Sequence, residues 1–313
     1  MKRAAVKAMR ACGHLAMHQL EQRLMHAQPS DHPTIFIIGA PRSGTSLLYE
    51  LMVMRMRFAY LSNAAHRFPQ TPLAASYLCK HAIERWRGNF TSRYGHISGW
   101  GAPNEGGAVW LRWLAEDGWS ESQHLDREHA KALRCLTAGL SKILEAPFLN
   151  KNVMHSVRIR LINQVWPDAL FIEVRRGTLD NARSIVRAQR AQKSYEEWWS
   201  VRPKLSQSYL GASDTVRAIA QVVGCASDIE EDCSAIGEAR LHRVHYAKLC
   251  ANPRDTLDQL GAFLKKNGAA ISIRGDVPER FPISPSAVLS MQDEFAMHDT
   301  LERLTHHAQK IAI

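Results

Sequence analysis

The sequence lacks the features of a secreted or membrane-spanning protein. Its six cysteines form no CxxC pair and share no repeated spacing, which is typical of reduced thiols in a cytoplasmic protein. No apolar run approaches the ~18 residues that a membrane-spanning helix needs. Residues 1–28 also lack the compact apolar core of a signal peptide. We therefore predict a cytoplasmic protein without a membrane span.

Acidic residues are in short supply, with 30 Asp and Glu against 40 Lys and Arg. This balance suits an anionic ligand, a nucleic acid or an acidic membrane surface. The 313 residues fit one large α/β domain or two small ones. We expect a single domain over residues 1–313, with an N-terminal helix at 1–28, a helical insertion at 62–145 and a tail at 271–313. The N-terminal helix is expected to pack on the domain, and peripheral membrane contact is the alternative.

The stretch TIFIIGAPRSGTSLLYELM, residues 34–52, predicts a phosphate-binding loop. It begins with an apolar, partly β-branched run that suits a buried strand. A small polar turn follows, and after it Leu47, Leu48, Leu51 and Met52 lie on one face of a helix. A strand, a glycine-bearing turn and a helix together direct backbone N–H groups and the positive end of the helix at an anion.

The loop lacks the lysine of a nucleoside-triphosphate site. Gly39 and Gly44 have the spacing of the G-x-x-x-x-G-K-[ST] loop, but Thr45 follows where lysine would reach the β- and γ-phosphates. Arg42 supplies a cation within the turn instead. The later strand at 169–174 is followed by basic residues rather than by an acid that would hold Mg²⁺. These features favour direct binding of an anion, without a metal.

The segment PRSGTS, residues 41–46, resembles the 5′-phosphosulfate loop of sulfotransferases that use 3′-phosphoadenylyl sulfate (PAPS). The second signature of that family is a strand that ends in Arg, with Ser eight positions later on a helix; Arg176 and Ser184 have this spacing in FIEVRRGTLDNARSI. A third segment, VHYAKLCANP, resembles the family's Y-E-D-L-x-x-x-P at Tyr246 and Pro253 but lacks its acids. The resemblance implies a P-loop-type parallel β-sheet flanked by helices. It also implies a set of PAPS-binding residues: Pro41, Arg42, Ser43, Gly44, Thr45, Ser46, Arg176, Ser184 and Tyr246.

Lys151 follows a predicted strand at 148–151, where open α/β sheets place ligand groups. In the family, a lysine there contacts the sulfuryl group. The animal enzymes carry a catalytic histidine two residues later, but this chain has Val153 at that position. Glu105, in the loop GWGAPNEGG, is our first candidate for the catalytic base, and His155 is the second. His66 and His96 are weaker candidates.

The segment at 62–145 contains Trp86, Trp100, Trp110, Trp113 and Trp119. These side chains form either a wall that stacks on a sugar or ordinary packing between helices. We favour a carbohydrate or glycolipid acceptor on this basis, and small-molecule alcohols also fit. Trp198 and Trp199, in a later loop, are expected to close over the adenine or the acceptor, or to lie in the core.

The sequence thus predicts transfer of a sulfuryl group from PAPS to an acceptor hydroxyl, with Arg42 and Lys151 as electrostatic catalysts. A P-loop kinase or NTPase would use the same loop with an ATP-reaching lysine and Mg²⁺. A non-enzymatic protein that binds RNA or acidic glycans would carry clustered cations on one face. We expect a small-molecule or glycan partner and no nucleic acid.

Overall fold

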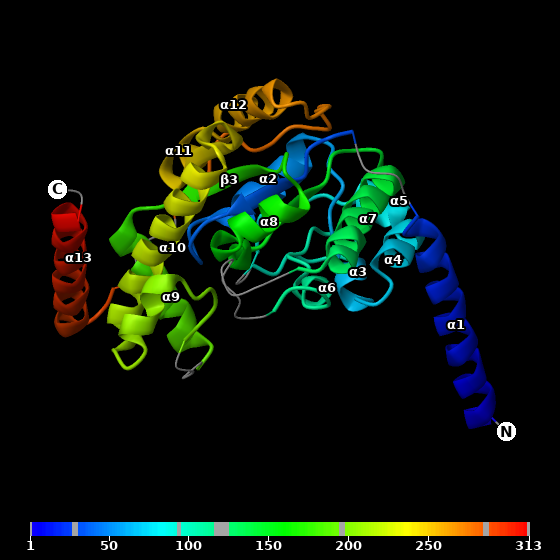
Figure 1. Ribbon diagram of the computed structural model, residues 1–313, viewed down its shortest axis with the longest axis horizontal. Helices are drawn as coiled ribbons and strands as arrows, with labels where there is room; N and C mark the ends of the chain where they lie inside the picture. The colour runs from blue at the N-terminus through cyan, green and yellow to red at the C-terminus, as the bar shows by residue number, and fades with distance from the viewer. Residues whose placement is uncertain are drawn as a thin grey trace.

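The computed structural model describes residues 2–26, 31–92, 95–115, 125–193, 198–283 and 288–311. Figure 1 shows a central sheet with helices packed around it. The four strands are β1 (Ile35–Ile38), β2 (Leu149–Lys151), β3 (Leu170–Arg175) and β4 (Leu241–His245). The α-helices are α1 (Lys2–Leu24), α2 (Thr45–Arg55), α3 (Asn63–Arg67), α4 (Pro72–Leu78), α5 (Lys80–Arg85), α6 (Gly107–Trp110), α7 (Arg127–Leu144), α8 (Ile159–Val165), α9 (Thr178–Ala191), α10 (Asp214–Ile236), α11 (Tyr246–Ala251), α12 (Pro253–Lys266) and α13 (Met291–Ile311). Three 3-10 helices complete the set: η1 (Val153–Val157), η2 (Lys204–Tyr209) and η3 (Glu238–Arg240).

The sheet is parallel throughout, with the strand order β2-β1-β3-β4. Ile35 pairs with Leu149 of β2 on one side and with Leu170 of β3 on the other. The chain therefore passes from β1 to β2 on one side, and then crosses back to β3 on the other side of β1. In open α/β sheets, ligands bind outside the carboxyl ends of the strands where the order reverses in this way. The fold places that point at the end of β1, directly before the predicted loop.

β1 forms because its residues suit burial on both faces of a parallel sheet. All four of its side chains are fully buried, and the ring of Phe36 stacks on that of Phe171 in β3 with centroids 5.9 Å apart. Helices α2 and α12 contact each other and the strands, whereas α8, α9 and α10 pack together as a second group. The P-loop-type α/β sheet predicted from the sequence is confirmed.

The segment at 62–145 contains five short to medium helices, α3 to α7. α7 begins where the Asp126 side chain accepts a hydrogen bond from the His129 amide, and ends at Glu145 in the left-handed conformation. Its apolar side, with Leu133, Leu136 and Leu140, is fully buried. Before this segment, Ala59 forms an isolated parallel bridge with Phe148, the residue that precedes β2.

The two terminal helices lie at opposite ends of the protein (Figure 1). α1 extends away from the body and is attached through Glu21, whose carboxylate accepts a 2.8 Å hydrogen bond from the Ala74 amide. Burial raises the pKa of Glu21 to about 7. α13 packs against α10, and its Glu294 forms an ion pair of 2.7 Å with Arg183 of α9. Within the described residues, no helix is long and apolar enough to cross a membrane.

Candidate active site

The loop between β1 and α2 has the backbone of an anion-binding turn. Arg42 has a φ of 65° and Gly44 a φ of 107°, so both adopt the left-handed conformation. Gly44 is the N-cap residue of α2, and no side chain there accepts a hydrogen bond from the first turn. The first N–H groups of a helix have no partner within the helix. The loop therefore offers uncapped N–H groups and the positive end of an 11-residue helix at the carboxyl end of β1.

Arg42, Arg176 and Ser184 lie together, although they come from three elements. The Arg42 Nε donates to the Ser184 Oγ at 3.4 Å. The Arg176 guanidinium donates to the Arg42 carbonyl oxygen, also at 3.4 Å. On α9, Asn181 donates a 2.6 Å hydrogen bond to the Pro41 carbonyl oxygen and thereby fixes the helix against the loop. Two cations and a hydroxyl are thus assembled beside the loop, as a site for a second phosphate requires.

Tyr246 closes this side of the loop. A Cβ added at Gly44 would lie 2.4 Å from its ring, so the loop approaches the ring as closely as a glycine allows. The Arg176 guanidinium lies over the same ring, 4.9 Å from its centroid. Arg175, by contrast, points away and pairs with Glu173 at 2.7 Å and Glu230 at 2.9 Å. The alternation of side chains along β3 therefore assigns Arg176, not Arg175, to the loop.

A cavity of about 440 Å³ opens in front of the loop. Most of the residues predicted to bind the donor line it, namely Pro41, Arg42, Gly44, Thr45, Ser46, Arg176 and Tyr246. Ser184 does not line the cavity itself, but its Oγ accepts a hydrogen bond from Arg42, which does. Ser43 is buried inside the turn, where its Oγ has no hydrogen-bond partner among the described residues.

Lys151 and Glu105 also line this cavity, next to the end of β1 and on the β2 side of it. Lys151 is the last residue of β2 and is 3 % exposed, whereas Glu105 is 33 % exposed. The Lys151 ammonium donates to the Glu105 Oε1 in a close ion pair. The Cβ position of Gly95 lies 2.9 Å from the same oxygen and 3.7 Å from the Ser46 Oγ. A buried cation and an accessible carboxylate therefore lie beside the first turn of α2.

The backbone of Glu105 is held rigidly. Its carbonyl oxygen accepts hydrogen bonds from the Trp110 indole at 2.9 Å and the Asn150 amide at 3.3 Å. On its C-terminal side, the Gly106 amide donates to the Asn104 Oδ1 at 2.8 Å, with Gly106 at a φ of 71°. Hydrogen bonds therefore hold this loop on both sides of Glu105.

His155 lies in the core and does not line the cavity. It is fully buried in η1, and its ring makes edge contacts with Phe36 and Trp110, at centroid distances of 5.3 and 5.0 Å. Burial, followed by the nearby Arg158, holds the pKa of His155 well below its usual range. His155 is therefore shielded from the cavity. His66 and His96 are exposed and are not among the residues that line it.

The four described tryptophans of the 62–145 segment do not line the cavity, which favours packing over a binding wall. Trp110 is buried and anchors Glu105, whereas Trp86 donates to the Ser98 carbonyl oxygen at 3.1 Å. Trp113 packs under the guanidinium of the preceding arginine, and Trp100 is 60 % exposed outside the cavity. Trp119 falls outside the described residues. The carbohydrate interpretation therefore loses the observation on which it depended.

Several cavity residues carry no sequence signal. Phe90 and Phe281 lie in separate loops, and their rings meet at a centroid distance of 5.0 Å. The Phe90 amide is held at 2.8 Å by Glu50, a buried carboxylate on α2 whose pKa is raised by burial. Phe90 and Phe281 match no motif, so only the folded chain identifies them. Trp199, for which the sequence left open a place over the ligand or in the core, also lines the cavity.

The described residues include no group of three or more His, Cys, Asp or Glu that could hold a metal ion. Five cysteines, Cys79, Cys135, Cys225, Cys233 and Cys250, are free thiols.

Comparison with known protein families identifies the family to which the chain belongs. The family model described as "Sulfotransferase family" matches residues 33–267, which contain β1 to β4, the loop, Arg176, Ser184 and the Lys151–Glu105 pair. The chain belongs to the sulfotransferase family. No match was found among curated proteins.

Solved structures of sulfotransferases resemble this chain at low identity. The sulfotransferase STF9 from Mycobacterium avium is 16% identical, with a TM-score of 0.52; the match covers 92% of this chain and 72% of that one. STF1 from Mycobacterium tuberculosis H37Rv is 15% identical over 90% and 75% of the two chains, with a TM-score of 0.48. A sulfotransferase from Alicyclobacillus acidocaldarius is 15% identical over 88% and 96%, with a TM-score of 0.44. At this identity the likeness to STF9 concerns the fold alone.

Proposed function

We propose that this sulfotransferase moves a sulfuryl group from PAPS to an acceptor hydroxyl. The observation that supports this most is the arrangement of two cationic groups on either side of the end of β1, along one cavity. Arg42, Arg176 and Ser184 cluster on the β3 side, and Lys151, at the end of β2, pairs with Glu105. One nucleotide with phosphates at its 3′ and 5′ positions and a sulfuryl group at one end has the matching distribution of charge.

The loop would bind the 5′-phosphate through the backbone N–H groups at Gly44, Thr45 and Ser46. These groups begin α2, so the helix dipole adds to the hydrogen bonds. Arg176 and Ser184 would bind the 3′-phosphate, with Arg42 shared between the two phosphates. Charge-assisted hydrogen bonds of this kind are stronger than neutral ones and discriminate sharply between one and two phosphates.

In the reaction, the acceptor oxygen forms a bond to sulfur while the bond from sulfur to the bridging oxygen of the 5′-phosphate breaks. The electron pair of the broken bond stays on that oxygen, and adenosine 3′,5′-bisphosphate leaves. Lys151 and Arg42 stabilise the negative charge that develops there. Glu105 accepts the proton of the acceptor hydroxyl, so atoms and charges balance. The Lys151–Glu105 contact supports a joint role for the two side chains at the reacting end of the donor.

The rival phosphotransferase would need a carboxylate available for Mg²⁺ beside the loop. Glu105 is the one carboxylate among the described lining residues, and it pairs with Lys151. The charge distribution therefore favours the sulfated donor. Sulfuryl transfer that persists in excess EDTA would separate the two activities.

Incubation with sulfur-labelled PAPS and a panel of hydroxyl acceptors tests the proposal. We expect labelled product from the wild-type protein and strongly reduced product from Arg42→Ala. A wild-type protein that binds neither PAPS nor its desulfated product would contradict the proposal. Steep salt dependence of RNA or acidic-glycan binding that ignores Arg42→Ala would favour the non-enzymatic alternative.

A further inference from the structure

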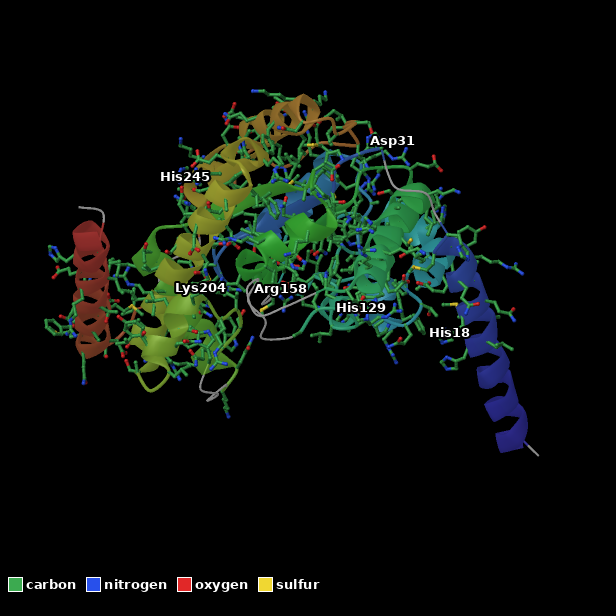
Figure 2. The ribbon with its side chains drawn as sticks, viewed as in Figure 1. His18, Asp31, His129, Arg158, Lys204 and His245 are labelled. Atoms are coloured by element: carbon green, nitrogen blue, oxygen red, sulfur yellow. The ribbon has the colours of Figure 1, made fainter. Side chains whose placement is uncertain are left out.

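The helix α13 lies beyond residues 33–267, which match the family model, yet it packs against helices of the candidate site. It contacts α10, and its Met297 is fully buried in the cluster that also contains Ala182 of α9. In Figure 2, Lys204 of η2, which contacts α10 as well, lies on the same side of the view as α13, and His18 of α1 lies on the other side. α13 therefore belongs to the part of the fold that contains α9.

Two arginines of α9 form ion pairs with the first turn of α13. The Arg183 Nε and Nη2 donate to the two carboxylate oxygens of Glu294, at 2.8 and 2.7 Å. Arg183 is 18 % exposed and Glu294 is 29 % exposed, and a bidentate pair of this kind fixes the orientation of both partners. Further along α9, Arg190 pairs with Asp293 at 3.1 Å and with Asp214 of α10 at 2.7 Å. α9 is thus attached to α13 at two points.

The two points of attachment lie on the face of α9 that points away from the loop. Asn181 and Ser184 are three residues apart and share one face, and hydrogen bonds join both of them to the loop. Arg183 and Arg190 are seven residues apart and share another face. At about 100° per residue, this second face points away from the first. α9 is therefore held between the loop on one face and α13 on the other.

The rotation of α9 about its axis determines where the Ser184 hydroxyl lies. Its Oγ is 3.4 Å from the Arg42 Nε, which is near the upper limit for a hydrogen bond. Arg42 belongs to the loop and Arg176 follows β3, so neither cation depends on α9 for its position. A small rotation of α9 would move the hydroxyl away from both cations. Ligand-binding groups need such support from the residues behind them.

We propose that α13 is a positioning element of the 3′-phosphate site, in which Glu294 holds Arg183 and thereby sets the rotation of α9 that places the Ser184 hydroxyl. This inference rests on the proposed sulfuryl transfer from PAPS. Arg183 and Glu294 do not line the cavity, so they act on the nucleotide only through α9. Their loss should weaken a ligand that carries a 3′-phosphate and spare a ligand that lacks it.

The test compares adenosine 3′,5′-bisphosphate with adenosine 5′-phosphate by calorimetry on full-length Arg183→Met, Glu294→Gln and the double variant. We expect each single change to raise the Kd for the bisphosphate about 3- to 10-fold, and to change the Kd for the 5′-phosphate less than about twofold. The double variant should lose no more than the weaker-binding single variant, because the two side chains form one interaction. Arg183→Lys, which keeps the charge, should retain part of the affinity.

Kinetics with labelled PAPS provide a second readout. The Lys151–Glu105 pair is unaltered in these variants, so we expect the KM for PAPS to rise while kcat stays at the wild-type value. A helix that merely stabilised the fold would lower the amount of active protein instead, and would not separate KM from kcat in this way.

Asp299→Asn is the matched control, because Asp299 is an acid of α13 whose ion pair with Arg303 stays within that helix. It should bind both nucleotides as the wild type does, and melting temperatures show whether each variant is folded. If Arg183→Met and Glu294→Gln bind the bisphosphate as the wild type does, or lose both nucleotides equally, the positioning inference is wrong and the proposed function stands.

Tighter binding of the bisphosphate by Glu294→Gln would also contradict the inference, because it would mean that the released Arg183 binds the phosphate itself. If the wild type does not bind the bisphosphate, both the inference and the proposed function fail.

Discussion

The proposed donor and acceptor sides of the cavity are built from different kinds of sequence. On the proposed donor side, the loop, Arg176 and Tyr246 follow three neighbouring strands, so the topology of the sheet alone brings them together. On the proposed acceptor side, Glu105 meets Lys151 from 46 residues away. The comparison teaches that changes on the donor side should weaken nucleotide binding, whereas changes on the acceptor side should slow turnover.

The largest effect is expected at Glu105. Glu105→Gln keeps the size and the backbone anchors of the residue but removes its ability to accept a proton. We expect kcat to fall by about 10²–10⁴-fold, while the affinity for adenosine 3′,5′-bisphosphate changes little. Single-turnover transfer from labelled PAPS measures the first quantity and calorimetry the second. A normal rate in Glu105→Gln would remove this carboxylate from the chemistry.

Lys151 should behave like Glu105 in kind but less strongly. Lys151→Met preserves the buried stem and removes the cation that faces the leaving oxygen. The loss of one such preorganised group lowers the rate on the order of 10²–10³-fold. The same kinetic measurement applies. A variant that loses nucleotide affinity but keeps its kcat would place Lys151 on the donor side and break the comparison.

Arg176 should show the opposite pattern. Removal of its guanidinium deletes charge-assisted contacts to the 3′-phosphate, and we expect the Kd for adenosine 3′,5′-bisphosphate to rise about 10- to 100-fold. Ser184→Ala removes one neutral hydroxyl and should cost about 2- to 10-fold. Calorimetry on both variants, with Arg175→Ala as the control, gives the order. Equal losses in all three would mean that no specific phosphate site exists.

A smaller effect, on stability, is expected at Glu50. Its carboxylate accepts a hydrogen bond from the amide of Phe90, a residue that lines the cavity. Burial raises its pKa above 4.5, so the folded state retains a proton that the unfolded state has lost. The free energy of unfolding should therefore fall as pH rises from about 4.5 through the folded pKa. Glu50→Gln removes this dependence and should melt roughly 1–3 °C higher at neutral pH but not below pH 4.5.

The exposed Glu302 of α13 provides the matched control, and Glu302→Gln should leave the thermal unfolding curves unchanged at every pH. Thermal unfolding of Glu50→Gln that follows the wild type at both pH values would show that Glu50 carries no raised pKa.

The sequence was most informative where the proposed site is formed by residues close together in the chain. The loop at 41–46 and the spacing of Arg176 and Ser184 predicted which residues gather beside β1, because a strand, a turn and a helix are local structures. The strand at 148–151 likewise placed Lys151 correctly at the edge of the sheet. These are also the elements that identify the parallel sheet.

The acceptor side was predicted less well, because its contacts link distant segments. A histidine four residues after Lys151 looks catalytic, yet the tight turn of η1 directs His155 into the core against Trp110. For the tryptophans at 62–145 the sequence left a binding wall and ordinary packing both open, and the indoles of Trp86 and Trp110 hydrogen-bond to loop carbonyl oxygens. Trp199 was a candidate from the sequence, but its place at the cavity depends on distant contacts such as that with Gln221.

The most direct measurement compares adenosine 3′,5′-bisphosphate with adenosine 5′-phosphate by calorimetry on the wild-type protein. Because Arg176 and Ser184 should bind a phosphate that the second ligand lacks, the account predicts that the bisphosphate binds about 100-fold more tightly. Equal affinities, or no heat of binding from either nucleotide, would contradict it.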